Sequence, residues 1–166
     1  MNKTLVCAAL LLLSFGASAQ SLWRDVPAGA TVAQVTALIP EALPAPAGIP
    51  ASSADERVLL HIPRVDLVDA AFAVSFGFEQ DKLRSIVLRA QPGSAEQARA
   101  VAQRLTTSLR SRYGLEISTR SRQEPLVPGI DRKWSYRRAS VHLQVLEETV
   151  VQLRYAAEVG RPANPL

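Results

Sequence analysis

The chain is poor in the residues that cross-link a fold or hold a metal ion. Among its 166 residues it has one cysteine, one methionine and two histidines. A single cysteine excludes an internal disulfide framework and a cysteine-rich zinc site. Beyond the N-terminal region, no apolar run reaches the roughly 18 residues that a membrane-spanning helix needs. We therefore expect no metal, no other cofactor and no transmembrane segment.

The common catalytic motifs are missing as well. The sequence has no phosphate-binding P-loop, no G-x-G-x-x-G fingerprint and no H-E-x-x-H helix. It also lacks the G-x-S-x-G turn that exposes a serine nucleophile in many hydrolases. The acidic pair Glu147 and Glu148 is more typical of a solvated turn than of the two carboxyl groups of a glycosidase. These absences favour a protein that is not an enzyme and assign no catalytic residue.

The N-terminus has the three parts of a secretory leader. Lys3 supplies the positive charge, residues 5–15 form a short apolar run, and A-S-A at residues 17–19 is a cleavage site. We therefore predict a signal peptide at residues 1–19 and a periplasmic or secreted mature protein. Cleavage also removes Cys7, and no lipid anchor is expected there because the apolar run follows this cysteine instead of preceding it.

Arginine dominates the positive charge of the chain. The net charge is +4, from 19 basic and 15 acidic side chains, and only three of the basic ones are lysine. The planar guanidinium fork pairs with carboxylates and phosphates. An exported protein rarely meets nucleic acid, so this charge suits an envelope protein or an anionic cell-wall or lipid surface. The sequence does not set the oligomeric state.

Two segments carry helix signals. Residues 31–39 begin with the capping pattern T-x-x-Q and end before Pro40, which disfavours helix at the residue before it. Residues 94–113 begin with S-x-x-Q and end before Gly114, a suitable left-handed C-cap. The second segment has a continuous apolar stripe at helical spacing. The stripe consists of Ala98, Val101, Ala102, Leu105 and Leu109.

Most of the remaining apolar residues alternate in the manner of strands. In residues 70–79 four large side chains alternate with small ones, which indicates a sheet that is packed on its large-residue face. The small face, which includes Gly77, is expected to carry something packed closely over it. Further strands are predicted at residues 57–65, 83–89, 115–122, 133–138, 141–145 and 151–155, with turns at residues 80–81 and 147–148.

These elements predict an α+β fold in which helices cover one face of an antiparallel sheet. Residues 20–159 form a single domain, with a proline-rich link at residues 40–53, a loop at residues 124–131 and a flexible tail at residues 160–166. The two helix starts align with each other, as do I-V-L-R ending at Arg89 and V-Q-L-R ending at Arg154. This alignment suggests two tandem helix-plus-three-strand units, with halves at residues 23–91 and 92–159.

The order of helix, proline-rich link and antiparallel strands resembles the small periplasmic BamE-like domains. W-R-D-V-P-A-G-A-T-V-A-Q-V-T-A-L-I-P, from residue 23, is similar to the opening of those domains, and F-G-F-E-Q-D-K-L-R-S-I-V-L is similar to their hairpin. The tandem arrangement resembles the β-lactamase inhibitory proteins. The chain departs from both families, because it has no lipid-bearing cysteine at the mature N-terminus and no cysteines for the inhibitors' disulfides. The resemblance implies an α+β fold and a binding role, and no functional residue is carried over.

The most suggestive cluster is the R-K-W-S-Y-R-R segment at residues 132–138. Trp134 and Tyr136 share one face of the predicted strand, and Arg137 and Arg138 follow. If the aromatic face is exposed, these four residues form an interaction patch for protein or glycan. The alternative is that Trp134 and Tyr136 fill the core.

The leading hypothesis is a non-catalytic binding protein that contacts another envelope protein or a cell-wall component. One alternative is a periplasmic hydrolase that uses His61 or His142 with Asp66 or Glu148, which requires a histidine beside an acid and a hydroxyl in a concave pocket. Another alternative is a small-ligand or lipid carrier, in which the Phe72–Phe78 face lines an apolar cavity. The competing hypothesis is that these phenylalanines pack in the hydrophobic core.

Overall fold

The computed structural model of the chain describes residues 21–119 and 130–158. The predicted leader, most of the predicted loop at residues 124–131 and the predicted tail at residues 160–166 lie outside this part. The elements run in the order α1 (Val32–Leu38), β1 (Leu43–Pro44), β2 (Arg57–Leu67), β3 (Ala70–Glu79), β4 (Lys82–Ala90), α2 (Ala95–Tyr113), β5 (Ser118–Thr119), β6 (Asp131–Tyr136), β7 (Ala139–Leu146) and β8 (Val150–Ala157).

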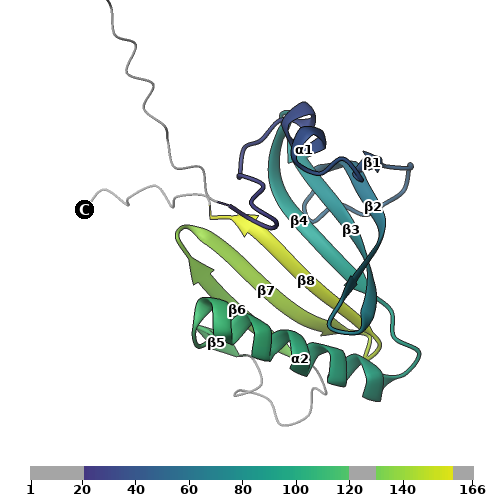
Figure 1. The fold of residues 1–166 in the computed structure, drawn as a ribbon, viewed down its shortest axis with the longest axis vertical. Coiled ribbons are helices and arrows are strands. Elements are labelled where there is room, and N and C mark those ends of the chain that lie inside the picture. The colour runs from purple at the N-terminus through teal and green to yellow at the C-terminus, as the bar shows by residue number, and fades with distance from the viewer. Residues whose placement is uncertain (1–20, 120–129, 159–166) are drawn as a thin grey trace, which may run out of the picture.

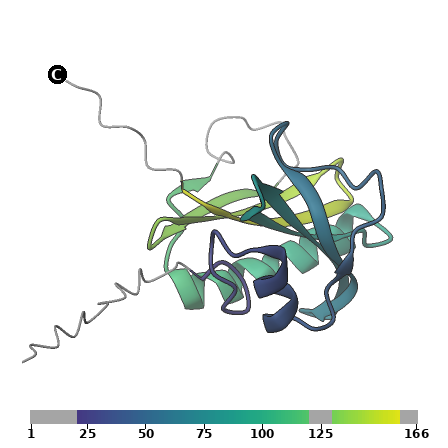
Figure 2. The same cartoon turned by 90° about the horizontal axis from the view of Figure 1, so that it is seen from above.

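The strands form one antiparallel sheet of eight strands in the order β1-β2-β3-β4-β8-β7-β6-β5 (Figure 1). Both helices lie on the same side of this sheet, as the view from above shows (Figure 2). The predicted α+β fold, with helices covering one face of an antiparallel sheet, is therefore confirmed. In the described residues, no helix is both long enough and apolar enough to cross a membrane.

The two halves of the domain have the same order of elements. Each half has a helix, a two-residue edge strand and three longer strands, and the halves meet where β4 pairs with β8. The alignment of I-V-L-R with V-Q-L-R places Leu88 on Leu153, and these two residues are register partners across that junction. The sheet order is thus mirrored about the junction, as expected for two like units related by a local two-fold axis.

The alternation in the strands separates a buried face from an open one. The core side chains Phe72, Phe76, Ile86, Leu88 and Leu153 are at most 2% exposed and lie on the helix side. They belong to the same core cluster as Val101, Ala102 and Leu105 of the predicted stripe on α2. The phenylalanines of β3 therefore belong to the core, and one of them, Phe72, also lines a hollow described below. The carrier alternative stays a prediction.

The caps and the central strands follow the predictions closely. Thr31 and Gln34 form a reciprocal capping box at α1, and Ser94 accepts a hydrogen bond from the backbone N–H of Gln97 at α2. The strand predicted at residues 70–79 has the same bounds in the structure. Pro63 lies beside a register irregularity of β2, beyond the two residues that β1 covers, so its missing N–H costs no ladder bond with β1.

The strands predicted at residues 57–65, 83–89, 141–145 and 151–155 extend one or two residues further in the structure, and two other predicted strands differ more. The strand predicted at residues 133–138 starts earlier and ends at Tyr136, because Arg137 and Arg138 turn the chain with φ of 48° and 66°. Within the described residues, the strand predicted at 115–122 is reduced to β5. The turns predicted at residues 80–81 and 147–148 are confirmed, since both residues of each pair also have positive φ.

Candidate functional site

The face of the sheet opposite the helices, here called the open face, carries mostly polar side chains. In β3 and β4 these are the residues between the buried ones, such as Ser75 and Arg89, and their neighbours continue across β8 and β7. Register pairs join Val87 to Arg154 and Arg154 to His142 in one row, and Arg89 to Gln152 and Gln152 to Gln144 in the next. The open face therefore places two arginines, a histidine and two amides side by side.

Residues 49–56, here called the crossing segment, lie against this face. Glu56 is its anchor, because its side chain is 7% exposed and Oε2 accepts a hydrogen bond of 2.7 Å from the hydroxyl of Ser85. Nη2 of Arg154 lies 3.5 Å from the other carboxylate oxygen. A Cβ at Gly77 would lie 2.6 Å from Oε2 of Glu56, so only glycine leaves room for the carboxylate. The expectation of close packing over the small face of this strand is confirmed.

A pocket of about 330 Å³, here called the open-face pocket, lies between the crossing segment and the sheet. Its polar lining comes from four strands, and its rim comes from residues 49–52. The lining side chains include Ser75, Arg89, His142, Gln144, Gln152 and Arg154. Such a pocket is at the small end of the range that binds organic ligands.

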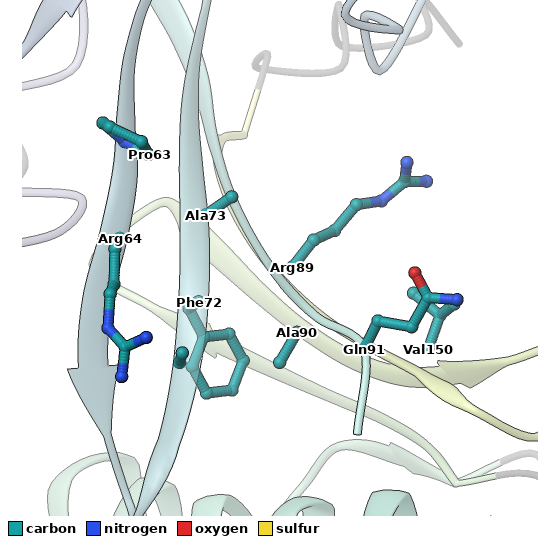
Figure 3. Close-up of a pocket in the computed structure, with 9 residues that line it drawn as sticks. Pro63, Arg64, Phe72, Ala73, Arg89, Ala90, Gln91 and Val150 are labelled. Carbon is teal, nitrogen blue, oxygen red and sulfur yellow. The ribbon is translucent and has the colours of Figure 1, made fainter. Parts of the chain in front are cut away.

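A second hollow, of about 450 Å³, adjoins the first at Arg89 (Figure 3). Its floor consists of small or apolar residues such as Pro63, Ala73 and Ala90, and Arg64 stands at its side. Figure 3 shows the side chain of Arg89 extending away from Ala73 and Pro63, so its guanidinium is held clear of the strand backbone. Together the two hollows form a groove across the open face, with Arg89 between them.

His142 has a carboxylate partner. Its Nε2 lies 2.6 Å from Oδ1 of Asp131, the register partner of Gln144 on the neighbouring strand β6. A carboxylate in this position orients the imidazole, which is the supporting half of a general-base arrangement. Among the described residues, no hydroxyl is hydrogen-bonded to His142, although Ser52 and Ser75 line the same pocket.

The acids that the sequence suggested for a hydrolase lie elsewhere. Asp66 pairs with Arg64 at 3.0 Å on the exposed end of β2, and Glu148 is in the β7–β8 turn. His61 is on β2, and three strands separate it from His142, a distance of about 19 Å at the usual strand spacing. Asp131 was missed because the sequence places it at the end of a loop, and only the register of β6 against β7 brings it to His142.

The predicted interaction patch is split by the structure. Trp134 is 1% exposed and donates a hydrogen bond of 3.0 Å from Nε1 to the carbonyl oxygen of Gly114, so it is a core residue and not part of a surface patch. Tyr136 is 44% exposed, with the guanidinium of Arg137 5.1 Å above its ring. Tyr136, Arg137 and Arg138 remain as an exposed aromatic and basic corner, and whether this corner binds a partner stays a prediction.

An ion-pair cluster ties the start of β6 to the end of α2. Glu116 accepts hydrogen bonds from Arg110 at 2.9 and 2.5 Å and also from Arg132 of β6. The hydrogen bond from Arg110 is the main cause that lowers the pKa of Glu116 to about 2. Both arginines are thus committed to holding the helix end on the sheet, and neither is free to serve the open face.

Comparison with known proteins adds little to this geometry. No protein-family model matches the chain, and no curated protein matches it. Among solved structures, the chain is similar to the crystal structure of YjgB, a DUF4309 family protein from Bacillus subtilis subsp. subtilis strain 168, with 14% sequence identity and a TM-score of 0.42. That match covers 77% of this chain and 78% of the other. The resemblance to BamE-like domains and β-lactamase inhibitory proteins stays a prediction.

Proposed function

We propose that the protein is a non-catalytic binding protein of the bacterial envelope and that the open face is its binding surface. The helix side of the sheet carries the core and, beside α2, a hollow of about 460 Å³, whereas the open face carries arginine, histidine and amide side chains around two adjoining hollows. The observation that carries the proposal is the position of Arg89 between the two hollows, exposed and without a carboxylate within 4 Å among the described residues.

The partner class follows from the leader and the charge of the chain. Export through the predicted signal peptide at residues 1–19 takes the protein to the periplasm or the medium. A net charge of +4, carried mostly by arginine, favours an acidic envelope protein or an anionic cell-wall component as the partner.

Blocking the open face tests this proposal. Ala73 is exposed on β3 and lines the second hollow, so Ala73→Trp should obstruct the groove without entering the core. The matched control is Gln103→Trp on the exposed side of α2. In chemical crosslinking on envelope preparations, the wild type and the control should capture the same specific product and Ala73→Trp should not. Equal capture by both tryptophan variants, with unchanged circular dichroism, would refute the open face as the binding surface.

A second candidate function is hydrolysis. The contact of 2.6 Å between His142 and Asp131 at the pocket wall supports it, because an oriented histidine is half of a catalytic dyad. The test is turnover of chromogenic ester, amide and phosphate substrates by the wild type, His142→Gln and Asp131→Asn. Activity that disappears in both variants would establish the hydrolase. Equal rates in all three proteins would exclude a role for this pair.

A further inference from the structure

The chain already shows how the open face holds a carboxylate. The side chain of Glu56, on the crossing segment, is only 7% exposed. Its carboxylate lies between the hydroxyl of Ser85 and the guanidinium of Arg154. In this arrangement a serine and an arginine of the sheet bind an acidic side chain from another segment of the chain. Such charge-assisted hydrogen bonds are stronger than neutral ones, and arginine favours them because of its planar fork.

Arg89 offers the same chemistry one position further along the sheet. It is diagonal to Arg154 across the β4–β8 pair, since Val87 is the partner of Arg154 and Arg89 is the partner of Gln152. Its Nε donates a hydrogen bond of 2.9 Å to Oε1 of Gln152. Gln152 thereby fixes the direction of the guanidinium and leaves both terminal nitrogens of Arg89 without a hydrogen-bond partner among the described residues.

The side chains around Arg89 include further hydrogen-bond donors, but among the described residues no carboxylate there is without a partner. Arg154 shares the pocket, and its Nε is buried with no hydrogen-bond partner in the described part of the chain. The nearby acids are already engaged, because Glu56 is held by Ser85 and Asp131 by His142. The terminal nitrogens of Arg89 therefore lack an acceptor among the described residues, and an incoming carboxylate supplies one of opposite charge.

We propose that the open-face pocket binds the side-chain carboxylate of an acidic residue in a partner protein, held by the terminal nitrogens of Arg89 with Arg154 beside it. This inference rests on the proposed binding function and names the chemistry of its partner. The second hollow supports a polypeptide as the occupant, since its floor of Pro63, Ala73 and Ala90 continues from Arg89 and suits the apolar parts of an extended segment. The crossing segment with Glu56 is the internal example of that mode of binding.

Two labelled peptides test the inference. The protein is the full chain, purified after the natural processing in its host cells. Fluorescence anisotropy is measured with fluorescein-labelled hexaglutamate and with hexaglutamine, which has the same length and no charge. Arg89→Gln removes the fork, and Arg99→Gln removes one positive charge from the exposed side of α2 as the matched control. We expect Arg89→Gln to weaken hexaglutamate binding about tenfold, because a hydrogen bond to a charged group contributes that much affinity. Arg99→Gln should change it less than about twofold.

Three results would overturn the inference. These are equal losses in the two variants, which would mean unspecific attraction to a basic protein, equal binding of the two peptides, and no saturable binding of hexaglutamate below about 1 mM. None of them bears on the capture experiment with Ala73→Trp. If Ala73→Trp still abolishes capture, the open face remains the binding surface and only the carboxylate chemistry is refuted. If Ala73→Trp leaves capture unchanged, the proposed function is refuted as well.

Discussion

Replacing Gly77 by alanine tests whether the crossing segment is seated on the sheet as described. A Cβ at Gly77 would lie 2.6 Å from Oε2 of Glu56 and 2.7 Å from Oγ of Ser85. Both atoms are at side-chain ends, so the strand keeps its path and the carboxylate must move. The substitution therefore breaks the hydrogen bond of 2.7 Å between Ser85 and Glu56 and leaves a shielded charge with a poorer partner.

Two opposing effects set the size of the expected change. Loss of a hydrogen bond to a charged group lowers the free energy of unfolding by about 1.5–3 kcal/mol. Alanine in a strand recovers about 0.5–1 kcal/mol relative to glycine, because the unfolded chain has less freedom to lose. We expect Gly77→Ala to lower the free energy of unfolding by about 1–2 kcal/mol, or the melting temperature by about 3–6 °C.

Urea unfolding followed by tryptophan fluorescence measures this change. The decisive comparison is a double-mutant cycle with Glu56→Ala, which removes the nearest atom that the new Cβ meets. In that background Gly77→Ala should cost less than about 0.5 kcal/mol. Ser75→Ala, on the same face of β3, controls for general effects and should change little, since its hydroxyl bond to Val87 is long at 3.4 Å. A cost for Gly77→Ala that is the same with and without Glu56 would refute the reasoning.

Three further predictions concern the end of α2 and the β6–β7 turn. Because the pKa of Glu116 is about 2, below the ordinary 4.5, the carboxylate stabilises the fold fully above pH 4.5 and loses this effect as the pH falls towards 2. Urea unfolding of the wild type and Glu116→Gln should differ at pH 6 and converge near pH 2, and a constant difference would contradict this. Replacing Arg137 and Arg138 by Asn-Gly should raise the free energy of unfolding by roughly 1 kcal/mol, because both positions have positive φ; a loss of stability would count against that turn. Trp134→Phe should lower it by roughly 1–2 kcal/mol by leaving the carbonyl of Gly114 unpaired, and no loss would contradict the hydrogen bond.

Local patterns predicted the elements that depend on local physics. The strand at residues 70–79 alternates large and small side chains along its whole length, and Ser94 carries its own capping signal, so both were predicted with their bounds. The turns at Val68–Asp69 and Arg137–Arg138 were not predicted, and in both of them residues other than the usual glycine or asparagine adopt positive φ. At these positions strand pairing on both sides imposes a backbone that the residues themselves do not favour.

The candidate site depends on strand register and was beyond reach of the sequence. The open-face pocket takes its lining from four strands and the link before β2, so no short motif contains it. Arg89 and Arg154 were noted only as the ends of a possible repeat, and Asp131 only as the end of a loop. The expectation that came nearest was the one at Gly77, because a glycine amid bulky strand residues marks a close approach even when the approaching group is unknown.

The junction between β4 and β8 has a consequence for how copies of the chain could associate. It joins residues far apart in sequence, such as Ser85 with Ala156, whereas every hairpin within a half is local. Opening this junction turns both strands into free edges with apolar side chains, while each half keeps its own hairpins. The short connection between β4 and α2, residues 91–94, would then act as a hinge, and β4 of one molecule could pair with β8 of another. Concentrated or partly denatured protein should therefore form exchanged dimers in which each sheet is built from halves of two chains.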